Sequence, residues 1–172
     1  KDRNGKCALR AESISRKDKF EHVSFDIRYG EIAGMFGLVG AGRTECAFSI
    51  FGADKIDSGK VFFEDKEVRF SNPAQAIKAG VCYLSEDRKA IGLFVDMTVR
   101  ENTIAACLKS ICSSIQFIKE DKSRSITKTY IEELEIHPSQ CMENRLSNLS
   151  GGNQQKVLFA KWLAANPKLL IV

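Results

Sequence analysis

The sequence has 172 residues, of which 44% are hydrophobic and 28% are charged, a balance typical of a globular domain. No apolar stretch approaches the roughly 20 residues that a membrane-spanning helix needs, and a net charge of +4 is too small and too dispersed to predict nucleic-acid binding. The six cysteines form no C-x-x-C pair, and no cluster of Cys or His has the spacing of metal ligands, so a metal centre at these residues is not predicted. The sequence does not begin with Met, and we expect it to be a fragment of a longer protein.

The first predicted elements are strands. The segment Ser13–Asp26 is expected to form a strand or hairpin, because Val23, Phe25 and Ile27 alternate with polar residues and so share one face. The short apolar run Glu31–Phe36 predicts a further strand, directly before a glycine-rich loop. A strand that leads into such a loop is the context in which phosphate-binding loops occur.

The glycine-rich loop, Gly37–Thr44, leads into a predicted helix that ends at Phe51. Its spacing matches the phosphate-loop pattern G-x-x-x-x-G-K-[ST] at every position but one, where Arg43 replaces lysine. The glycines allow a tight turn whose amides point inward around an anion, and the Thr44 hydroxyl can bind Mg²⁺. The alternative is a tight strand-to-helix turn without a ligand. The candidate phosphate-binding residues are Gly37, Gly40, Ala41, Gly42, Arg43, Thr44 and Glu45.

Two residues of this loop make the predicted phosphate site degenerate. Arg43 presents a larger planar group than lysine, and the two are not interchangeable at a tight site. Glu45 brings a carboxylate close to the expected triphosphate, which would repel it. We therefore expect weaker nucleotide binding here than at an intact loop.

The next predicted elements continue the mixture of strands and helices. Strands are expected over Gly59–Phe63 and Val68–Phe70, on either side of a turn. A helix over Asn72–Ala79 is predicted by its cap residue and by proline in the first turn, with Gly80 as its stop. The continuous apolar run Val81–Leu84 predicts a buried strand.

An acidic residue, Glu86, follows this buried strand. Its carboxylate could bind Mg²⁺ as a hard oxygen ligand. It could equally be a structural acid that pairs with Arg88 or Lys89. Both interpretations stay open, and Glu86 is the only residue considered for a catalytic role.

The remainder of the chain is predicted to be rich in helix. Met97–Ile118 is expected to be mainly helical, Lys119–Lys128 to be a solvated loop and helix face, and Thr129–Ile136 to be an amphipathic helix. A helix over Gly151–Ala165 ends before a proline, and Lys168–Val172 reads as another buried strand.

The helix that starts at Gly151 follows a Leu-Ser-Gly-Gly turn within Leu149–Val157. Two glycines let a ligand approach the backbone closely, and the amides and dipole at a helix start favour an anion. Ser150 adds a hydroxyl donor beside them. The alternative is a capped, glycine-rich helix start that binds nothing. The candidate residues are Ser150, Gly151, Gly152 and Asn153.

This turn resembles the signature motif of ATP-binding cassette (ABC) proteins, in which it clamps the γ-phosphate of an ATP held by a partner domain. Together with Gly37–Glu45 and Ser85–Lys89, it makes the chain resemble one narrower family. That family is the tandem ATPase subunits of bacterial importers of ribose, xylose and galactose type, and the resemblance is to their second, C-terminal nucleotide-binding domain. It extends from about Ala8 to Val172.

The resemblance implies an α/β fold of the P-loop NTPase class, an ABC-type ATPase domain with a RecA-like core and an inserted helical subdomain. Residues 1–87 would form the core with the phosphate loop, 88–165 the mainly helical subdomain, and 166–172 a core strand. The domain would be incomplete at its C-terminus. The catalytic groups that follow Leu169–Val172 in the family would then be missing, so the fragment alone should not hydrolyse ATP.

The implied function is the ATP-binding component of a sugar importer, with ATP and Mg²⁺ as cofactors. The implied partners are the other nucleotide-binding domain of the parent chain, the transmembrane permease subunits and, indirectly, an extracytoplasmic sugar-binding protein, with no nucleic acid. The location would be peripheral, on the cytoplasmic face of the membrane. Glu86 occupies the glutamine-loop position, and Val95–Asn102 resembles the region that meets the permease's coupling helix. The sugar itself is not indicated.

Two other functions remain open. One is a regulatory nucleotide-binding module that does not hydrolyse ATP, which Arg43 and Glu45 favour. The other is a soluble ABC ATPase of DNA repair or translation, although such proteins usually keep the loop lysine. An aromatic residue that stacks on adenine is not assigned, because the nearest ring, Phe20, is expected to lie in the core.

Overall fold

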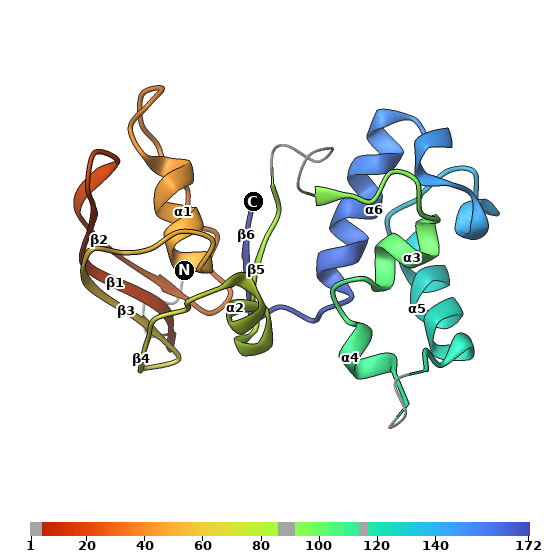
Figure 1. Ribbon diagram of the computed structural model, residues 1–172, viewed down its shortest axis with the longest axis horizontal. Coiled ribbons are helices and arrows are strands. Elements are labelled where there is room, and N and C mark those ends of the chain that lie inside the picture. Colours follow the sequence, from red (N-terminus) through yellow and green to blue (C-terminus); the bar gives the residue numbers. More distant parts are fainter. Residues whose placement is uncertain (1–4, 86–91, 114–116) are drawn as a thin grey trace. The chain divides into compact units, whose positions relative to one another are not determined.

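The computed structural model describes residues 5–85, 92–113 and 117–172 (Figure 1). The chain forms two compact units. The first extends to Tyr83 and also includes Ile171, and the second contains Leu84–Leu170 and Val172.

The first unit is built on a four-stranded antiparallel sheet with the order β2-β1-β3-β4. The strands are β1 (Cys7–Arg16), β2 (Phe20–Arg28), β3 (Ser58–Phe63) and β4 (Lys66–Val68). The predicted hairpin is confirmed, and its turn places Asp18 at φ 60°. Apolar residues on one face of the central strands, including Leu9, Ile14 and Val61, are almost fully buried. The sheet therefore supplies the core on which the helices of this unit pack.

Helices α1 (Arg43–Phe51) and α2 (Pro73–Ala79) accompany strand β5 (Val81–Tyr83) in the same unit. The predicted α2 is confirmed: the Asn72 side chain accepts from the Gln75 amide, and Gly80 ends the helix at φ 100°. The Tyr83 ring lies 4.9 Å from the Phe48 ring and 5.7 Å from the Phe51 ring, so β5 packs directly on α1. Strand β6 (Leu169–Ile171) pairs with β5, and it is half-buried, whereas a buried strand was predicted.

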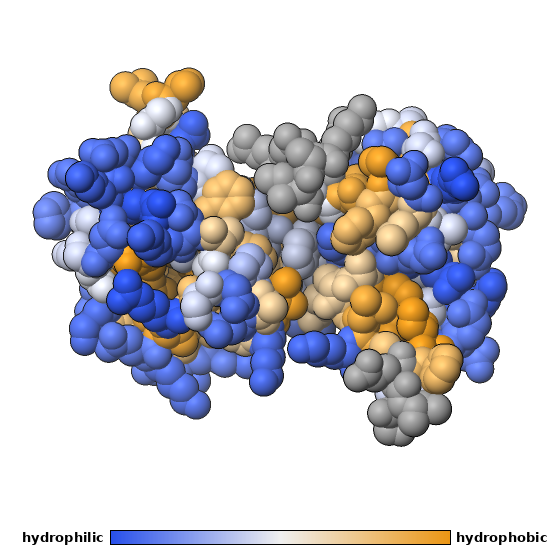
Figure 2. Space-filling model, in the orientation of Figure 1, coloured by the Kyte–Doolittle hydropathy of each residue, from blue (hydrophilic) through white to orange (hydrophobic). Residues whose placement is uncertain are grey.

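The segment Glu31–Phe36 does not form the predicted strand. No strand of the described residues pairs with it, and its large apolar side chains are exposed, with Ile32 95% and Phe36 98% exposed. Figure 2 shows apolar surface projecting above α1 in this part of the first unit. Because a strand needs a hydrogen-bonded neighbour, the apolar pattern alone was not sufficient.

The second unit is helical. Its elements are α3 (Val99–Ile104), α4 (Leu108–Ile111), α5 (Glu120–Glu133), α6 (Gly151–Leu163) and the 3₁₀ turns η2 (Cys141–Glu143) and η3 (Leu146–Asn148). The predicted helical stretch over 97–118 is interrupted, since α3 and α4 are short and separate. The charged stretch 119–128, predicted as loop and helix face, is the first part of α5 except for its N-cap residue, Lys119.

Polar contacts connect the helices of this unit. A capping box between Thr98 and Glu101 starts α3, and the hydrogen bonds from Thr98 hold the pKa of the Glu101 carboxyl below its usual value. The Arg100 guanidinium contacts Glu143 at 3.0 Å and Glu120 at 3.2 Å, which joins α3 to η2 and α5. Ile104, Cys107 and Ile111 form an apolar cluster between these helices. None of the helices in the described residues is long and apolar enough to span a membrane.

Candidate functional site

The loop before α1 has the backbone of an anion-binding turn. The Ala41 amide donates to the Leu38 carbonyl at 3.0 Å, and Gly40 and Gly42 take φ values of 82° and 78°. The hydrogen bonds of α1 begin with the Cys46 amide, which donates to the Gly42 carbonyl at 2.8 Å. The amides of Arg43, Thr44 and Glu45 therefore precede this ladder, at the positive end of the helix dipole.

Gly42 is the point at which this loop contacts the sheet. A Cβ at this position would overlap the Lys19 carbonyl oxygen and lie 3.0 Å from the Phe20 Cβ. Only glycine therefore fits, both for its positive φ and for this close approach. The loop is fixed against the turn between β1 and β2.

The side chains of Arg43, Thr44 and Glu45 differ in whether they are free to meet a ligand. Arg43 and Thr44 are exposed, where a ligand can reach them. The Glu45 carboxylate forms a salt bridge of 3.7 Å with Lys19, which partly neutralises it. Both partners are substantially exposed, at 36% and 49%, so the pair contributes little to stability. It does reduce the repulsion that Glu45 was expected to exert on a phosphate.

A cavity of about 400 Å³ lies beside this loop, between β2, residues 33–36 and the first turn of α1. Phe20 lines it but is only 6% exposed, which agrees with a core residue. Cys46 also lines it, and burial raises the pKa of its thiol to about 11. The thiol is therefore protonated at neutral pH and is not a reactive nucleophile.

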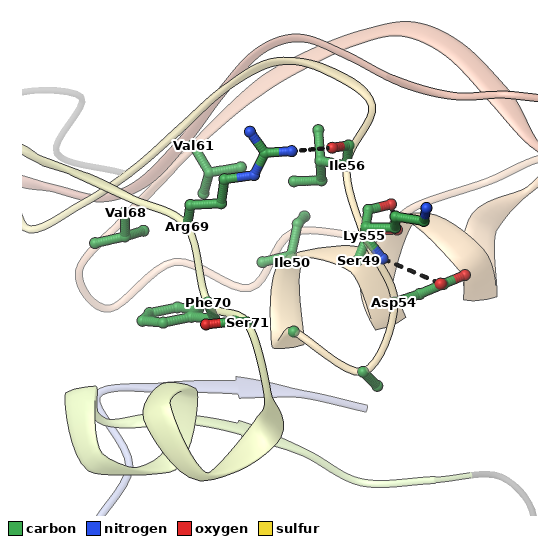
Figure 3. Close-up of a pocket in the computed structure, with 12 residues that line it drawn as sticks. Ser49, Ile50, Asp54, Lys55, Ile56, Val61, Val68, Arg69, Phe70 and Ser71 are labelled. Atoms are coloured by element: carbon green, nitrogen blue, oxygen red, sulfur yellow. Dashed lines mark hydrogen bonds between the residues drawn. The ribbon is translucent and has the colours of Figure 1, made fainter.

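A second cavity, of about 420 Å³, surrounds the other end of α1 near Gly52 (Figure 3). Two of the charged side chains that line it are engaged within the protein. Figure 3 shows the Arg69 guanidinium directed at the Ile56 carbonyl, to which it donates at 2.7 Å, and Asp54 pairs with Arg16 at 2.8 Å. None of the residues that line this cavity belongs to the phosphate loop, so it is a separate feature.

The second predicted site, in the helical unit, is the turn that opens α6. Ser150 is the N-cap residue, and its hydroxyl oxygen accepts from the Asn153 amide at 3.4 Å. Ser150, Gly151 and Gly152 are exposed, and a Cβ added at Gly152 would meet no atom within 4 Å. The first intrahelical bond runs from the Gln154 amide to the Ser150 carbonyl at 2.9 Å. The turn thus combines a hydroxyl, a helix start and open space above Gly152.

Side chains behind the turn hold it in place. The Gln154 carboxamide, which is 8% exposed, donates to the carbonyls of Leu146 at 3.2 Å and Leu149 at 3.0 Å. Asn153 accepts from the His137 amide at 3.0 Å and donates to the Ser150 hydroxyl at 3.1 Å. The Asn153 side chain is therefore engaged with its own chain. No role was predicted for Gln154 from the sequence, although its position one turn after Ser150 could have indicated one.

The two predicted sites lie in different units, with Gly37–Glu45 in the first and Ser150–Asn153 in the second. Glu86, the candidate ligand of Mg²⁺, lies outside the described residues, as do Arg88 and Lys89. Among the residues that are described, no group of three or more His, Cys, Asp or Glu side chains could hold a metal ion.

Comparisons with known proteins agree on one family. A family profile described as ABC transporter matches residues 20–172. "Ribose import ATP-binding protein RbsA" of Geobacillus kaustophilus is 43% identical over 168 residues, which are 98% of this chain and 34% of that protein. A protein of the same name from Clostridium tetani is 40% identical over the whole chain and 34% of its own length. "Putative ribose/galactose/methyl galactoside import ATP-binding protein 3" of Agrobacterium fabrum is 43% identical over 98% of this chain and 33% of its own length.

Solved structures support the same fold. A nucleotide-free ATP-binding cassette from an ABC transporter matches with a TM-score of 0.76 and 23% identity, covering 95% of this chain and 67% of its own. The ADP conformation of the cassette MJ1267 matches with a TM-score of 0.76 and 24% identity, over the same shares of both chains. The fold is that of an ABC ATPase domain. The chain spans about a third of the length of the curated relatives.

Proposed function

This chain belongs to the ABC transporter family, and on that premise we propose that it forms part of the ATP-binding component of a bacterial sugar importer. In its native polypeptide it would help to couple ATP binding and hydrolysis to the uptake of a monosaccharide. The relatives named for ribose and for ribose/galactose/methyl galactoside import suggest that class of sugar. The observation that carries the proposal is the pre-organised turn at Ser150.

In this proposal the turn acts on a nucleotide held by another nucleotide-binding domain of the same polypeptide. The Ser150 hydroxyl and the amides of the first turn of α6 would bind the γ-phosphate. The space above Gly152 allows the phosphate to approach the backbone. Gln154 keeps the turn in position by donating hydrogen bonds to the carbonyls of Leu146 and Leu149. Such fixed donors stabilise phosphate charge without reorganisation during the reaction.

The phosphate loop would hold a second nucleotide more weakly. The loop amides from Gly37 to Thr44 would surround the phosphates, Arg43 would replace the usual lysine, and Thr44 would bind Mg²⁺. A bound Mg²⁺ would supply neutralisation of the phosphate charge. We propose that Glu86 is a further ligand of this Mg²⁺, on the sequence alone, since it lies outside the described residues. The first unit would then be the core of the domain and the second its helical subdomain.

The segment before α3 would face the permease. Phe94 is 48% exposed and Met97 is 47% exposed, so two large apolar side chains lie at the surface close together in the sequence. Exposed apolar groups of this kind are characteristic of protein contacts. The domain would therefore lie peripherally on the cytoplasmic face of the membrane, with the sugar-binding protein acting through the permease and no nucleic acid involved.

A regulatory module that binds but does not hydrolyse ATP is the second candidate. Arg43 favours it, because arginine fits a tight phosphate site differently from lysine. Glu45 also favours it, as an acidic residue next to the loop, although its salt bridge with Lys19 partly neutralises its charge. In this case the chain would contribute the Ser150 turn to its partner and hold its own nucleotide without turnover.

Sugar uptake by the reconstituted transporter separates these functions. The native polypeptide, its permease and a sugar-binding protein would be incorporated into vesicles, and labelled ribose uptake and ATP hydrolysis would be measured together. We expect uptake that requires ATP hydrolysis. Hydrolysis without any uptake, across the candidate monosaccharides, would instead indicate a soluble ABC ATPase. Uptake during which one of the two bound nucleotides is never hydrolysed would indicate the regulatory module.

A further inference from the structure

A lysine is buried near the C-terminal end of α6, in the helical unit. Lys161 lies on α6 and is only 7% exposed. Its ammonium group donates to the Gly92 carbonyl at 2.9 Å and lies 5.0 Å from the centre of the Phe94 ring. The same group lies 5.1 Å from the centre of the Trp162 ring. Lys161 therefore joins α6 to the segment that precedes α3.

Phe94 is held from the other side by α3. Asn102, which is 0% exposed, accepts from the Phe94 amide and donates to the Phe94 carbonyl, both at 2.8 Å. The Phe94 side chain is nevertheless 48% exposed. The Phe94 backbone is thus held by α3 and its ring contacts Lys161 of α6. The exposed part of the ring belongs to the surface that we propose for the permease.

Burying a lysine at this position is less favourable than burying an apolar side chain, if packing is its only role. Burial lowers the pKa of its ammonium group, because a charge is less stable away from water. A carbonyl and two aromatic rings offset that cost in part. An apolar side chain of similar length would fill the same space without the desolvation penalty. The charged group does provide something that an apolar one cannot, which is a directional hydrogen bond to Gly92.

We propose that Lys161 is a positioning residue that makes the segment Gly92–Phe94 move with helix α6. An ATP bound at the Ser150 turn would then be sensed at the exposed surface of Phe94 and Met97. Lys161 lies 11 residues after Ser150, or about 16 Å along a helix. Because a hydrogen-bonded helix moves as a rigid element, a shift at its first turn reaches Lys161 without a further relay. This inference rests on the proposed function of the Ser150 turn.

Amide hydrogen exchange in the native polypeptide tests this coupling. Exchange would be measured over residues 92–97 and 150–153, with and without a non-hydrolysable MgATP analogue, in the wild type, Lys161→Met and Lys161→Arg. In the wild type the analogue should slow exchange in both segments, by about tenfold over 92–97. Lys161→Met should lose the slowing over 92–97 but keep it over 150–153. Lys161→Arg, which retains the charge and a hydrogen-bond donor, should show the slowing over both 92–97 and 150–153.

Each other outcome has a definite meaning. Equal slowing over 92–97 in the wild type and in Lys161→Met, or none there in the wild type despite slowing over 150–153, would overturn the role of Lys161. Unchanged exchange over 150–153 in the wild type would contradict the proposed function itself, and the inference with it. If circular dichroism shows that Lys161→Met does not fold, Lys161→Gln must lose the same slowing, because its shorter, uncharged side chain removes the ammonium group that donates to the Gly92 carbonyl.

Discussion

Replacement of Gly42 by alanine is expected to lower the stability of this domain by about 3 kcal/mol or more. Two costs add at this position. The φ of 78° is unfavourable for any residue with a Cβ, and the added Cβ would overlap the Lys19 carbonyl. Because the obstacle is backbone at the end of a paired strand, it cannot move aside without disturbing the hairpin. Urea unfolding of the native polypeptide, followed for the transition of this domain, measures the loss.

Gly40→Ala is the matched control for this prediction. Gly40 has a similar φ of 82°, but a Cβ there would meet no atom within 4 Å. Gly40→Ala should therefore lower the stability of the domain only by the penalty of the positive φ, about 1 kcal/mol. Equal losses for the two variants would mean that the loop does not pack against the turn at Lys19 as described.

Gly152→Asp is expected to lower the ATPase activity of the native polypeptide by about a hundredfold or more, a loss of about 2.7 kcal/mol in transition-state stabilisation. The fold should tolerate the change, because a Cβ at Gly152 meets open space and a carboxylate near a helix N-terminus is favourable. The same carboxylate would occupy the approach to the turn and repel the phosphate. Activity should therefore fall while the unfolding transition stays in place.

Gln155→Asp supplies the comparison for that variant. Gln155 is exposed on the same helix, three residues further along, so it receives the same added charge without entering the turn. Its activity should stay close to that of the wild type. If Gly152→Asp and Gln155→Asp have similar activities, the space above Gly152 is not the place where phosphate binds.

Local signals in the sequence predicted several elements well. Asn72, the proline after it and Gly80 define α2 at both ends, because each acts on backbone groups within one turn of itself. Ser150 likewise caps α6 at the predicted position. Such features depend on a few neighbouring residues, and no distant part of the chain is needed to establish them.

Features that depend on distant residues were not predictable in the same way. The run Glu31–Phe36 has the composition of a strand, but strand formation depends on a neighbour that a local pattern does not reveal. Lys161 would ordinarily be placed in solvent, and its contacts come from Gly92 and Phe94, far away in the sequence. Its spacing of four residues from buried Val157, on the same helix face, was the available signal.

Amide exchange over Ser150–Asn153 in the unmodified native polypeptide tests directly whether this turn binds the phosphate of a nucleotide. A saturating non-hydrolysable MgATP analogue should slow exchange in this segment by about tenfold or more, because bound phosphate protects the amides at the helix start. Gly152→Asp should abolish the slowing. If calorimetry shows the analogue bound and exchange over Ser150–Asn153 is nevertheless unchanged, the turn does not contact nucleotide and the account is wrong.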